Sequence, residues 1–185
     1  RPALLLLVAV FLVCLPRAEL HDWIGTEGRR VQIASEMVAT GDWMVPRLSG
    51  QRTFAKPPLH YWLVAASISL FGDGYFAARI PSIVALWLTA LLAFGLHRRA
   101  FGVGAAWTAS LGVVCAPLVV VKFATAEIDP LFACLVASSL WLLAFGVARE
   151  RRDSMVFAGV VGGLAFLTKG PVYFVFAAGA FFVWW

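Results

Sequence analysis

Charged residues are scarce in this 185-residue sequence, and acidic ones are the scarcer kind. Only 14% of the residues are charged and 62% are hydrophobic, with 10 acids against 15 lysines and arginines. A soluble domain is usually about half apolar and a quarter charged. The shortage of charge therefore excludes an ordinary water-soluble domain, and it predicts a chain whose main solvent is lipid.

Cysteine is scarce as well, and its placement excludes a cysteine-based metal site. Cys14, Cys115 and Cys134 each lie inside an apolar run, without the spacing of metal ligands. We interpret them as small buried hydrophobes. The net charge of +5 does not indicate nucleic acid, because the basic residues lie between apolar runs and form no stripe.

Long apolar runs make up most of the sequence. A helix needs about 20 apolar residues to cross the bilayer core. The sequence predicts one all-α transmembrane domain over residues 1–185, which we expect to be a fragment because it begins at Arg1 and ends in an apolar run. The first run is short enough for a signal-peptide core, but no small-x-small cleavage site follows it, so a first span is favoured. The predicted spans are 2–16, 76–96, 103–121, 130–148, 154–168 and 170–185.

The short loops predict the orientation of these spans. One loop holds His97, Arg98 and Arg99, and another covers residues 149–152 with three arginines. Short basic loops face the cytoplasm. The long segment 20–75 is therefore predicted to lie outside, at the plasma (inner) membrane with a periplasmic active face.

The outer segment has helix signals of its own. Thr26 and Glu27 resemble a helix start, and Thr40 and Gly41 resemble a helix end with glycine in the left-handed conformation. An apolar stripe between them predicts an amphipathic helix. Residues 57–72 carry no charge, and we expect a second helix there that lies in the membrane interface.

Several ionisable residues fall on the predicted outer face, at helix ends or just beyond them. Each has an ordinary structural explanation, such as a cap, a favourable helix-dipole contact or a snorkelling side chain. Together they predict a site for an anionic, membrane-borne ligand, in which cations hold a phosphate and a carboxylate takes a proton. The predicted catalytic residues are Glu27 and Asp129, and the predicted substrate-binding residues are Arg29, Arg30, Lys56, Tyr61, Arg79, Glu127 and Lys169.

Six motifs follow one another along the chain: EGRRVQIASEMVATGDW at 27–43, VPRLSG at 45–50, AKPPLHYW at 55–62, FAARIP at 76–81, AEIDP at 126–130 and GLAFLTKGP at 163–171. In this order they resemble the family that holds lipid A aminoarabinose transferases and protein O-mannosyltransferases. The resemblance implies a GT-C fold, a polyprenyl-phosphate sugar donor and an inverting transfer to a lipid or protein acceptor. It places Arg29 and Lys56 near the carrier phosphate, and Asp129 and Lys169 at other functional positions.

Two departures from the family pattern concern the acids. The usual Asp-Glu pair is Thr26-Glu27 here, and the Glu that often precedes the Lys-Pro pair is Ala55. Glu27 is thus the remaining carboxylate of its pair, and Ala55 weakens the case for a metal, although a divalent metal stays open. Two other readings remain: a transporter or lipid flippase, and a catalytically inactive relative that binds the carrier.

Overall fold

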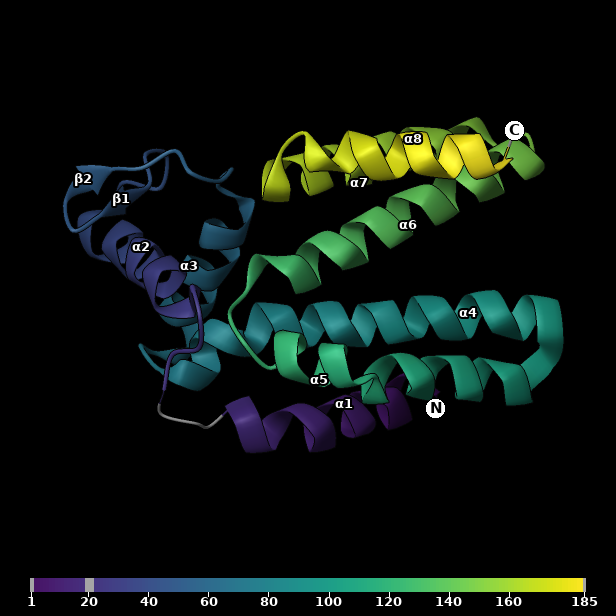
Figure 1. Ribbon diagram of the computed structural model, residues 1–185, viewed down its shortest axis with the longest axis horizontal. Coiled ribbons are helices and arrows are strands. Elements are labelled where there is room, and N and C mark those ends of the chain that lie inside the picture. Colours follow the sequence, from purple (N-terminus) through teal and green to yellow (C-terminus); the bar gives the residue numbers. More distant parts are fainter. Residues whose placement is uncertain (1, 19–21, 185) are drawn as a thin grey trace.

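The computed structural model describes residues 2–18 and 22–184, and nearly all of them are helical (Figure 1). This confirms the predicted all-α class. Residues 1 and 185 of the predicted domain, and residue 20 at the predicted start of the outer segment, lie outside the described residues. The elements are α1 (Pro2–Ala18), α2 (Glu27–Thr40), β1 (Arg47–Leu48), β2 (Gln51–Arg52), α3 (Leu59–Phe71), α4 (Tyr75–Cys115), α5 (Pro117–Phe123), α6 (Ile128–Ala148), α7 (Arg152–Lys169) and α8 (Val172–Trp184).

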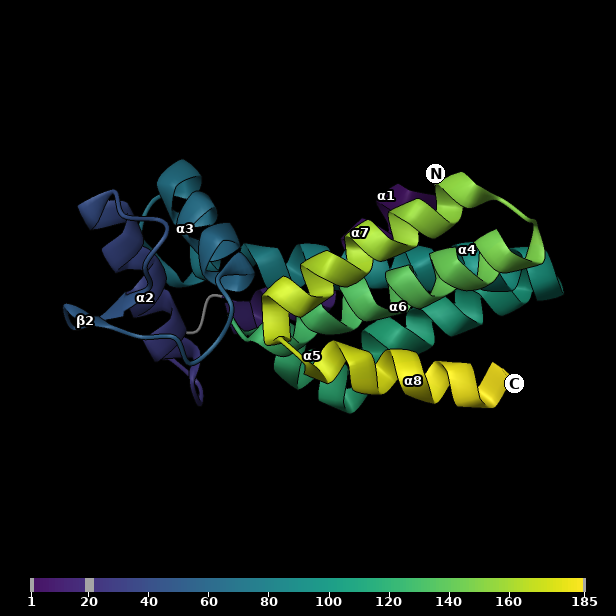
Figure 2. The same cartoon turned by 90° about the horizontal axis from the view of Figure 1, so that it is seen from above.

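The long helices run along one axis, and α2, α3 and the small β1–β2 hairpin lie together at one end of them (Figures 1 and 2). We call this the capped end. The opposite end carries the sharp turn inside α4 and the link from α6 to α7, and it holds the arginines predicted to be cytoplasmic; we call it the basic end. The alternating directions bring the start of α6 and the end of α7 to the capped end, as the predicted topology requires.

The turn inside α4 lies at Gly102, where φ is 87° and ψ is −176°. Only glycine adopts this region without strain. The predicted loop at 97–99 is instead helical, and the chain reverses a few residues later. The predicted single span 103–121 is also interrupted: α4 ends at Cys115, Ala116 is extended, and Pro117 begins α5. Helical geometry is disfavoured for the residue before a proline, here Ala116. Proline itself is common in the first turn of a helix, as Pro117 is in α5.

Helix α2 has the predicted bounds. Gly41 is left-handed, with φ of 72°, and its N–H donates to the carbonyl of Met37. Thr26 occupies the N-cap of α2, as expected, although its hydroxyl makes no capping bond. The pair Asp129-Pro130 suggested an N-cap at Asp129 for the span 130–148. That prediction is wrong, because α6 begins at Ile128 and Glu127 occupies the N-cap position.

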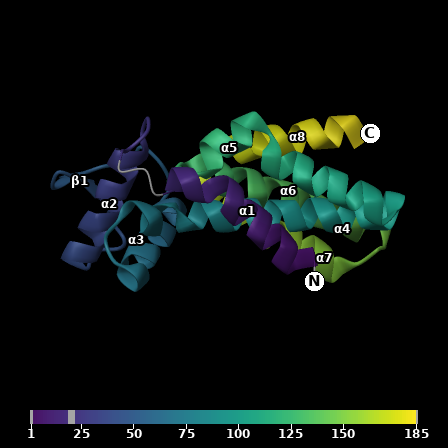
Figure 3. The same ribbon diagram turned by 90° about the horizontal axis from the view of Figure 1, so that it is seen from below.

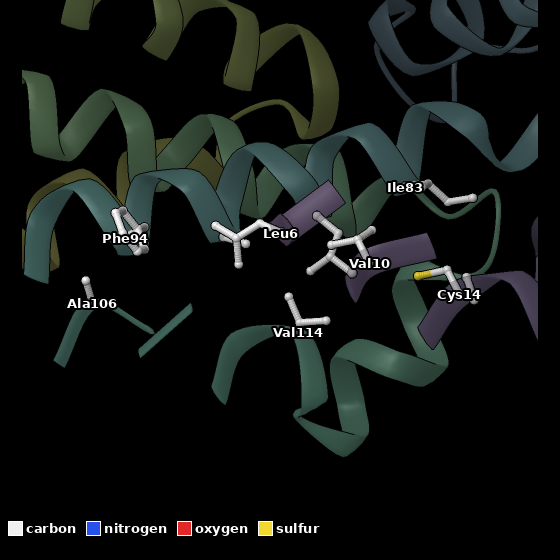
Figure 4. Packing of buried hydrophobic residues seen from close by; sticks show 10 residues of the cluster. Leu6, Val10, Cys14, Ile83, Phe94, Ala106 and Val114 are labelled. Carbon is white, nitrogen blue, oxygen red and sulfur yellow. The ribbon is translucent and has the colours of Figure 1, made fainter. Parts of the chain in front are cut away.

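Three apolar clusters hold the fold. In the first, Leu6, Val10 and Cys14 lie four residues apart on α1 and pack against both arms of α4 (Figure 4). The view from below shows α1 lying across those arms (Figure 3). The second cluster joins α2 to α3, and the third joins α6 to α7. Cys115, expected to be buried, is exposed.

Two of the described helices, α4 and α6, are long and apolar enough to cross a bilayer. Shorter apolar stretches occur in α1, α3 and α8. Many large apolar side chains on the long helices are exposed, which suits a surface that faces lipid. The crossing of each predicted span, and the interfacial position of α2 and α3, stay predictions.

Candidate functional site

The start of α2 is fixed by a buried ion pair between Glu27 and Arg79 of α4. Both side chains are 0% exposed. The Nε of Arg79 donates to one carboxylate oxygen at 2.7 Å, and Nη2 donates to the other at 3.0 Å. The backbone N–H groups of Ile24 and Ala126 also donate to Glu27, at 3.0 and 2.6 Å. The carboxylate of Glu27 is therefore enclosed by donors.

Glu127, just before α6, makes the reciprocal contact with α2. Its carboxylate accepts hydrogen bonds from the backbone N–H of Thr26 at 3.3 Å and from the Thr26 hydroxyl at 3.0 Å. It also pairs with Arg30, and both side chains are nearly buried. We call Glu27, Arg79, Arg30 and Glu127 the α2–α6 clasp. Each of these buried ions contacts an opposite charge, which offsets the cost of removing it from water. A buried ion without its partner would be strongly destabilising.

A pocket of about 490 Å³ opens between the segment before α3 and the end of α7. Lys56 and Lys169 both line it, together with Pro57, Pro58 and Gly170. The Nζ of Lys169 donates to Asp129 at 2.5 Å, and the Asp129 side chain is 43% exposed. Two ammonium groups from distant segments thus meet at one pocket, with an accessible carboxylate next to one of them.

The remaining predicted residues lie apart from this pocket. Arg29 is exposed on the first turn of α2, and Tyr61 is only 3% exposed in the apolar cluster of α2 and α3. Burial raises the pKa of the Tyr61 phenol. The structure therefore divides the predicted site residues into the clasp, the pocket group of Lys56, Asp129 and Lys169, and these two outlying side chains.

The predicted acids are paired with cations, whereas two of the predicted cations are not paired with any acid that the structure describes. The acids Glu27, Glu127 and Asp129 each pair with a cation. Lys56 and Arg29 are exposed, and among the described residues neither has an ion-pair partner. These two cations are thus accessible to an anionic group.

His60 of α3 was not among the predicted site residues. The imidazole is 0% exposed, and neither ring nitrogen has a hydrogen-bond partner among the described residues. Burial, and the charge of Arg30, lower its pKa from 6.5 to about 3, while Asp129 acts in the opposite direction. The ring is therefore neutral, and it is close enough to Arg30 and Asp129 for both charges to act on it. Its burial in three dimensions left no signal in the local sequence.

No group of three His, Cys, Asp or Glu side chains gathers to hold a metal ion within residues 2–18 and 22–184. A divalent metal stays a prediction.

Comparison with known protein families identifies the family of this chain. The profile of the family described as dolichyl-phosphate-mannose-protein mannosyltransferase matches residues 55–185. The chain belongs to this family. Family membership agrees with the resemblance seen in the motifs, and the transporter reading loses its support.

Individual relatives are similar over nearly the whole chain. An undecaprenyl phosphate-alpha-4-amino-4-deoxy-L-arabinose arabinosyl transferase 2 of Pseudomonas fluorescens is 37% identical over 90% of this chain and 30% of its own length. The corresponding transferase of Edwardsiella ictaluri is 36% identical over 89% of this chain and 30% of its own. This chain therefore spans about a third of the length of these relatives.

Solved structures show the same fold. ArnT from Cupriavidus metallidurans in the apo state superimposes with a TM-score of 0.83 at 30% identity, over 92% of this chain and 33% of that one. The same protein bound to undecaprenyl phosphate gives 0.84 at 29% identity, over 93% and 33%. The predicted GT-C membrane fold is confirmed by these matches.

Proposed function

We propose that the full-length protein is a glycosyltransferase that takes a sugar from a polyprenyl-phosphate carrier at the capped end of its helices. The observation that carries this proposal is the pocket where Lys56 and Lys169 meet beside Asp129. Its position in a family of polyprenyl-phosphate-dependent transferases supports the choice of ligand, as does the relative solved with undecaprenyl phosphate.

Lys56 is the main phosphate ligand in this proposal. It lines the pocket, is exposed and has no acidic partner among the described residues, so its ammonium is available to a ligand. Lys169 contributes from the other side while it remains bound to Asp129. Fixed cations stabilise the negative charge that builds on the leaving phosphate, and this lowers the barrier to transfer. Arg29 adds positive charge on the same exposed face.

Asp129 is the better placed of the two predicted proton acceptors. A general base must come within hydrogen-bond reach of the proton it takes. The carboxylate of Asp129 is partly exposed, whereas that of Glu27 is enclosed and bound by Arg79 and two backbone groups. We therefore assign the base to Asp129 and a positioning role to Glu27. The acceptor hydroxyl attacks the anomeric carbon opposite the phosphate, so the configuration inverts.

The remaining clasp residues and Tyr61 act through the position of α2 and α3. Arg30, Arg79 and Glu127 hold these helices against the start of α6, next to the pocket, and Tyr61 fills their core. The arginines of the basic end fit the cytoplasmic side of a plasma (inner) membrane. The capped end then faces the periplasm, where a membrane lipid or a protein is the acceptor.

The test uses the full-length protein in proteoliposomes with a polyprenyl-phosphate sugar, and it measures carrier affinity and turnover separately. Lys56→Ala should weaken carrier binding about tenfold or more, because hydrogen bonds to charged groups contribute about 1.5–3 kcal/mol. Asp129→Asn should lower turnover with little loss of carrier affinity. Arg52→Ala, which removes an exposed cation of β2 outside the pocket, serves as the control.

Three results would contradict the proposal. One is full activity in both site variants, and another is an equal loss in Arg52→Ala. The third is tight carrier binding without turnover in the wild type, under conditions where a relative is active. That last result would favour the inactive carrier-binding reading, which the Thr26 departure motivates.

A further inference from the structure

A second concave region lies far from the pocket just described, toward the basic end. There α6 slants away from α4 as both helices leave the capped end (Figure 1). The space between them holds two cavities of about 450 and 380 Å³, which share Leu96, Arg99 and Trp141 as lining residues. We call the joined space the α4–α6 groove. Its size is typical of small-ligand sites.

The two parts of the groove differ in chemistry. The part nearer the middle of the helices is lined mainly by apolar side chains, such as Leu88 and Leu135. The outer part is lined by Arg99 and Arg149 with the rings of Trp141 and Phe145. The guanidinium of Arg99 lies 5.8 Å from the centre of the Phe145 ring. An apolar channel therefore ends at two cations.

No acidic side chain from the described part of the chain lines either cavity. Two guanidinium groups facing one small space repel each other unless an anion lies between them. Arginine binds phosphate oxygens through its planar fork of N–H donors. Basic pockets between membrane helices are a known mode of recognising anionic lipid head groups.

We propose that the α4–α6 groove binds an anionic phospholipid from the leaflet at the basic end. The phosphate lies between Arg99 and Arg149, and one acyl chain runs toward Leu88 between α4 and α6. Charge complementarity favours this occupant over a further helix of the full-length protein. An apolar helix laid over the groove would bury two guanidiniums without a partner, and uncompensated buried charge costs several kcal/mol.

The proposal is tested on the full-length protein in nanodiscs that contain a phosphatidylglycerol with a photoreactive acyl chain. After illumination, the labelled peptides are identified by mass spectrometry. Labelling is expected within 88–99 and 134–149. Arg99→Ala with Arg149→Ala should reduce it about tenfold or more, since hydrogen bonds to charged groups contribute about 1.5–3 kcal/mol.

The matched control is Arg98→Ala with Arg152→Ala, which removes the same charge from the same end but from residues that do not line the groove. It should change labelling less than about twofold. A third variant, Ser138→Trp, fills the apolar channel and leaves both arginines intact, and it should also reduce labelling. Thermal unfolding of every variant checks that the fold is retained.

Three outcomes overturn the proposal. Equal losses in the two arginine pairs would mean that the leaflet is attracted by general surface charge. Absence of label from α4 and α6 in the wild type would mean that other segments of the protein fill the groove. Unchanged labelling in Ser138→Trp would place the acyl chain outside the channel.

Discussion

Among single residues, Arg79 is the one on which the capped end depends most. Its guanidinium is 0% exposed, binds Glu27 through two nitrogens, and lies 5.7 Å and 5.6 Å from the ring centres of Trp23 and Tyr75. Arg79→Ala would leave the Glu27 carboxylate buried without its cation. Removing one partner of a buried pair costs about 3–5 kcal/mol.

We therefore expect Arg79→Ala to lower the thermal unfolding temperature of the full-length protein in detergent clearly and reproducibly. Arg98→Ala, which removes an exposed arginine of α4 near the other end, should leave it nearly unchanged. Equal unfolding temperatures for the two variants would show that the clasp contributes little to stability.

His60 leads to a prediction on pH. Burial lowers the pKa of its imidazole from 6.5 to about 3. In the folded protein the ring therefore stays unprotonated at a pH where His60 of the unfolded chain takes up a proton. Stability is therefore lost as the pH falls below 6.5, and the loss continues down to about 3. The rate of loss is about 1.4 kcal/mol per pH unit.

The measurement compares the thermal unfolding of the wild type and of His60→Leu at pH 7 and pH 5. The wild type should lose about 2 kcal/mol more than the variant between these values. At pH 7 the variant should be as stable as the wild type or more so, because leucine leaves no buried polar group without a partner. An identical pH response in the two proteins would contradict the buried, neutral imidazole.

Among the elements, α4 depends on one backbone conformation. Gly102 has φ of 87° and ψ of −176°, whereas Gly104, two residues later, has an ordinary helical backbone. Gly102→Ala should lower the free energy of unfolding by about 1–3 kcal/mol, because residues with a side chain disfavour this backbone conformation. Gly104→Ala should be neutral or slightly stabilising, because alanine favours helix and nothing lies within 4 Å of its added carbon. Thermal unfolding of both variants checks the contrast, and equal effects would refute it.

Two side chains of α2, Glu36 and Gln32, hydrogen-bond to the turn of the β1–β2 hairpin. Glu36 accepts hydrogen bonds from the backbone N–H groups of Ser49 at 2.6 Å and Gly50 at 3.1 Å. These bonds hold the pKa of Glu36 below its usual range, with the Gly50 bond the largest cause. Glu36→Ala should speed amide hydrogen exchange at residues 47–52, whereas Asp73→Ala should not. Unchanged exchange in Glu36→Ala would mean that the hairpin is held by other contacts.

The elements also differ in how far sequence could predict them. Helix α2 was predictable because glycine marks its end and its apolar stripe faces one side. The turn of α4 was expected at 97–99, since the cluster of charge suggested a loop. His97 and the two arginines after it continue the helix, and the first residue that can reverse the chain without strain is Gly102. Pro117 causes the break at Ala116, but residues 103–121 were predicted as one span because the whole run is apolar.

The candidate site was predictable as a group of residues on one face but not as a set of pairs. Alternating spans were enough to place Glu27, Lys56 and Asp129 at one end. Two partners of Glu27, Arg79 and Ala126, lie 52 and 99 residues away in sequence, so no local pattern indicates them. Sequence therefore offered Glu27 as an open base, whereas the folded chain encloses it and leaves Asp129 accessible.

On the scale of the whole molecule, the two ends carry charge in different arrangements. At the capped end Glu27, Glu127 and Asp129 are each paired with a cation, and Lys56 is left available in the lining of the pocket. At the basic end arginines line an apolar groove. This division suits a protein that handles anionic lipids on both sides of a membrane.

We propose that the carrier phosphate binds in the pocket of Lys56 and Lys169. An experimental structure of the full-length protein with undecaprenyl phosphate bound tests this directly. We expect the phosphate within hydrogen-bond distance of the Lys56 ammonium, with Asp129 facing the same space. A phosphate bound elsewhere, with Lys56 turned to solvent, would contradict it.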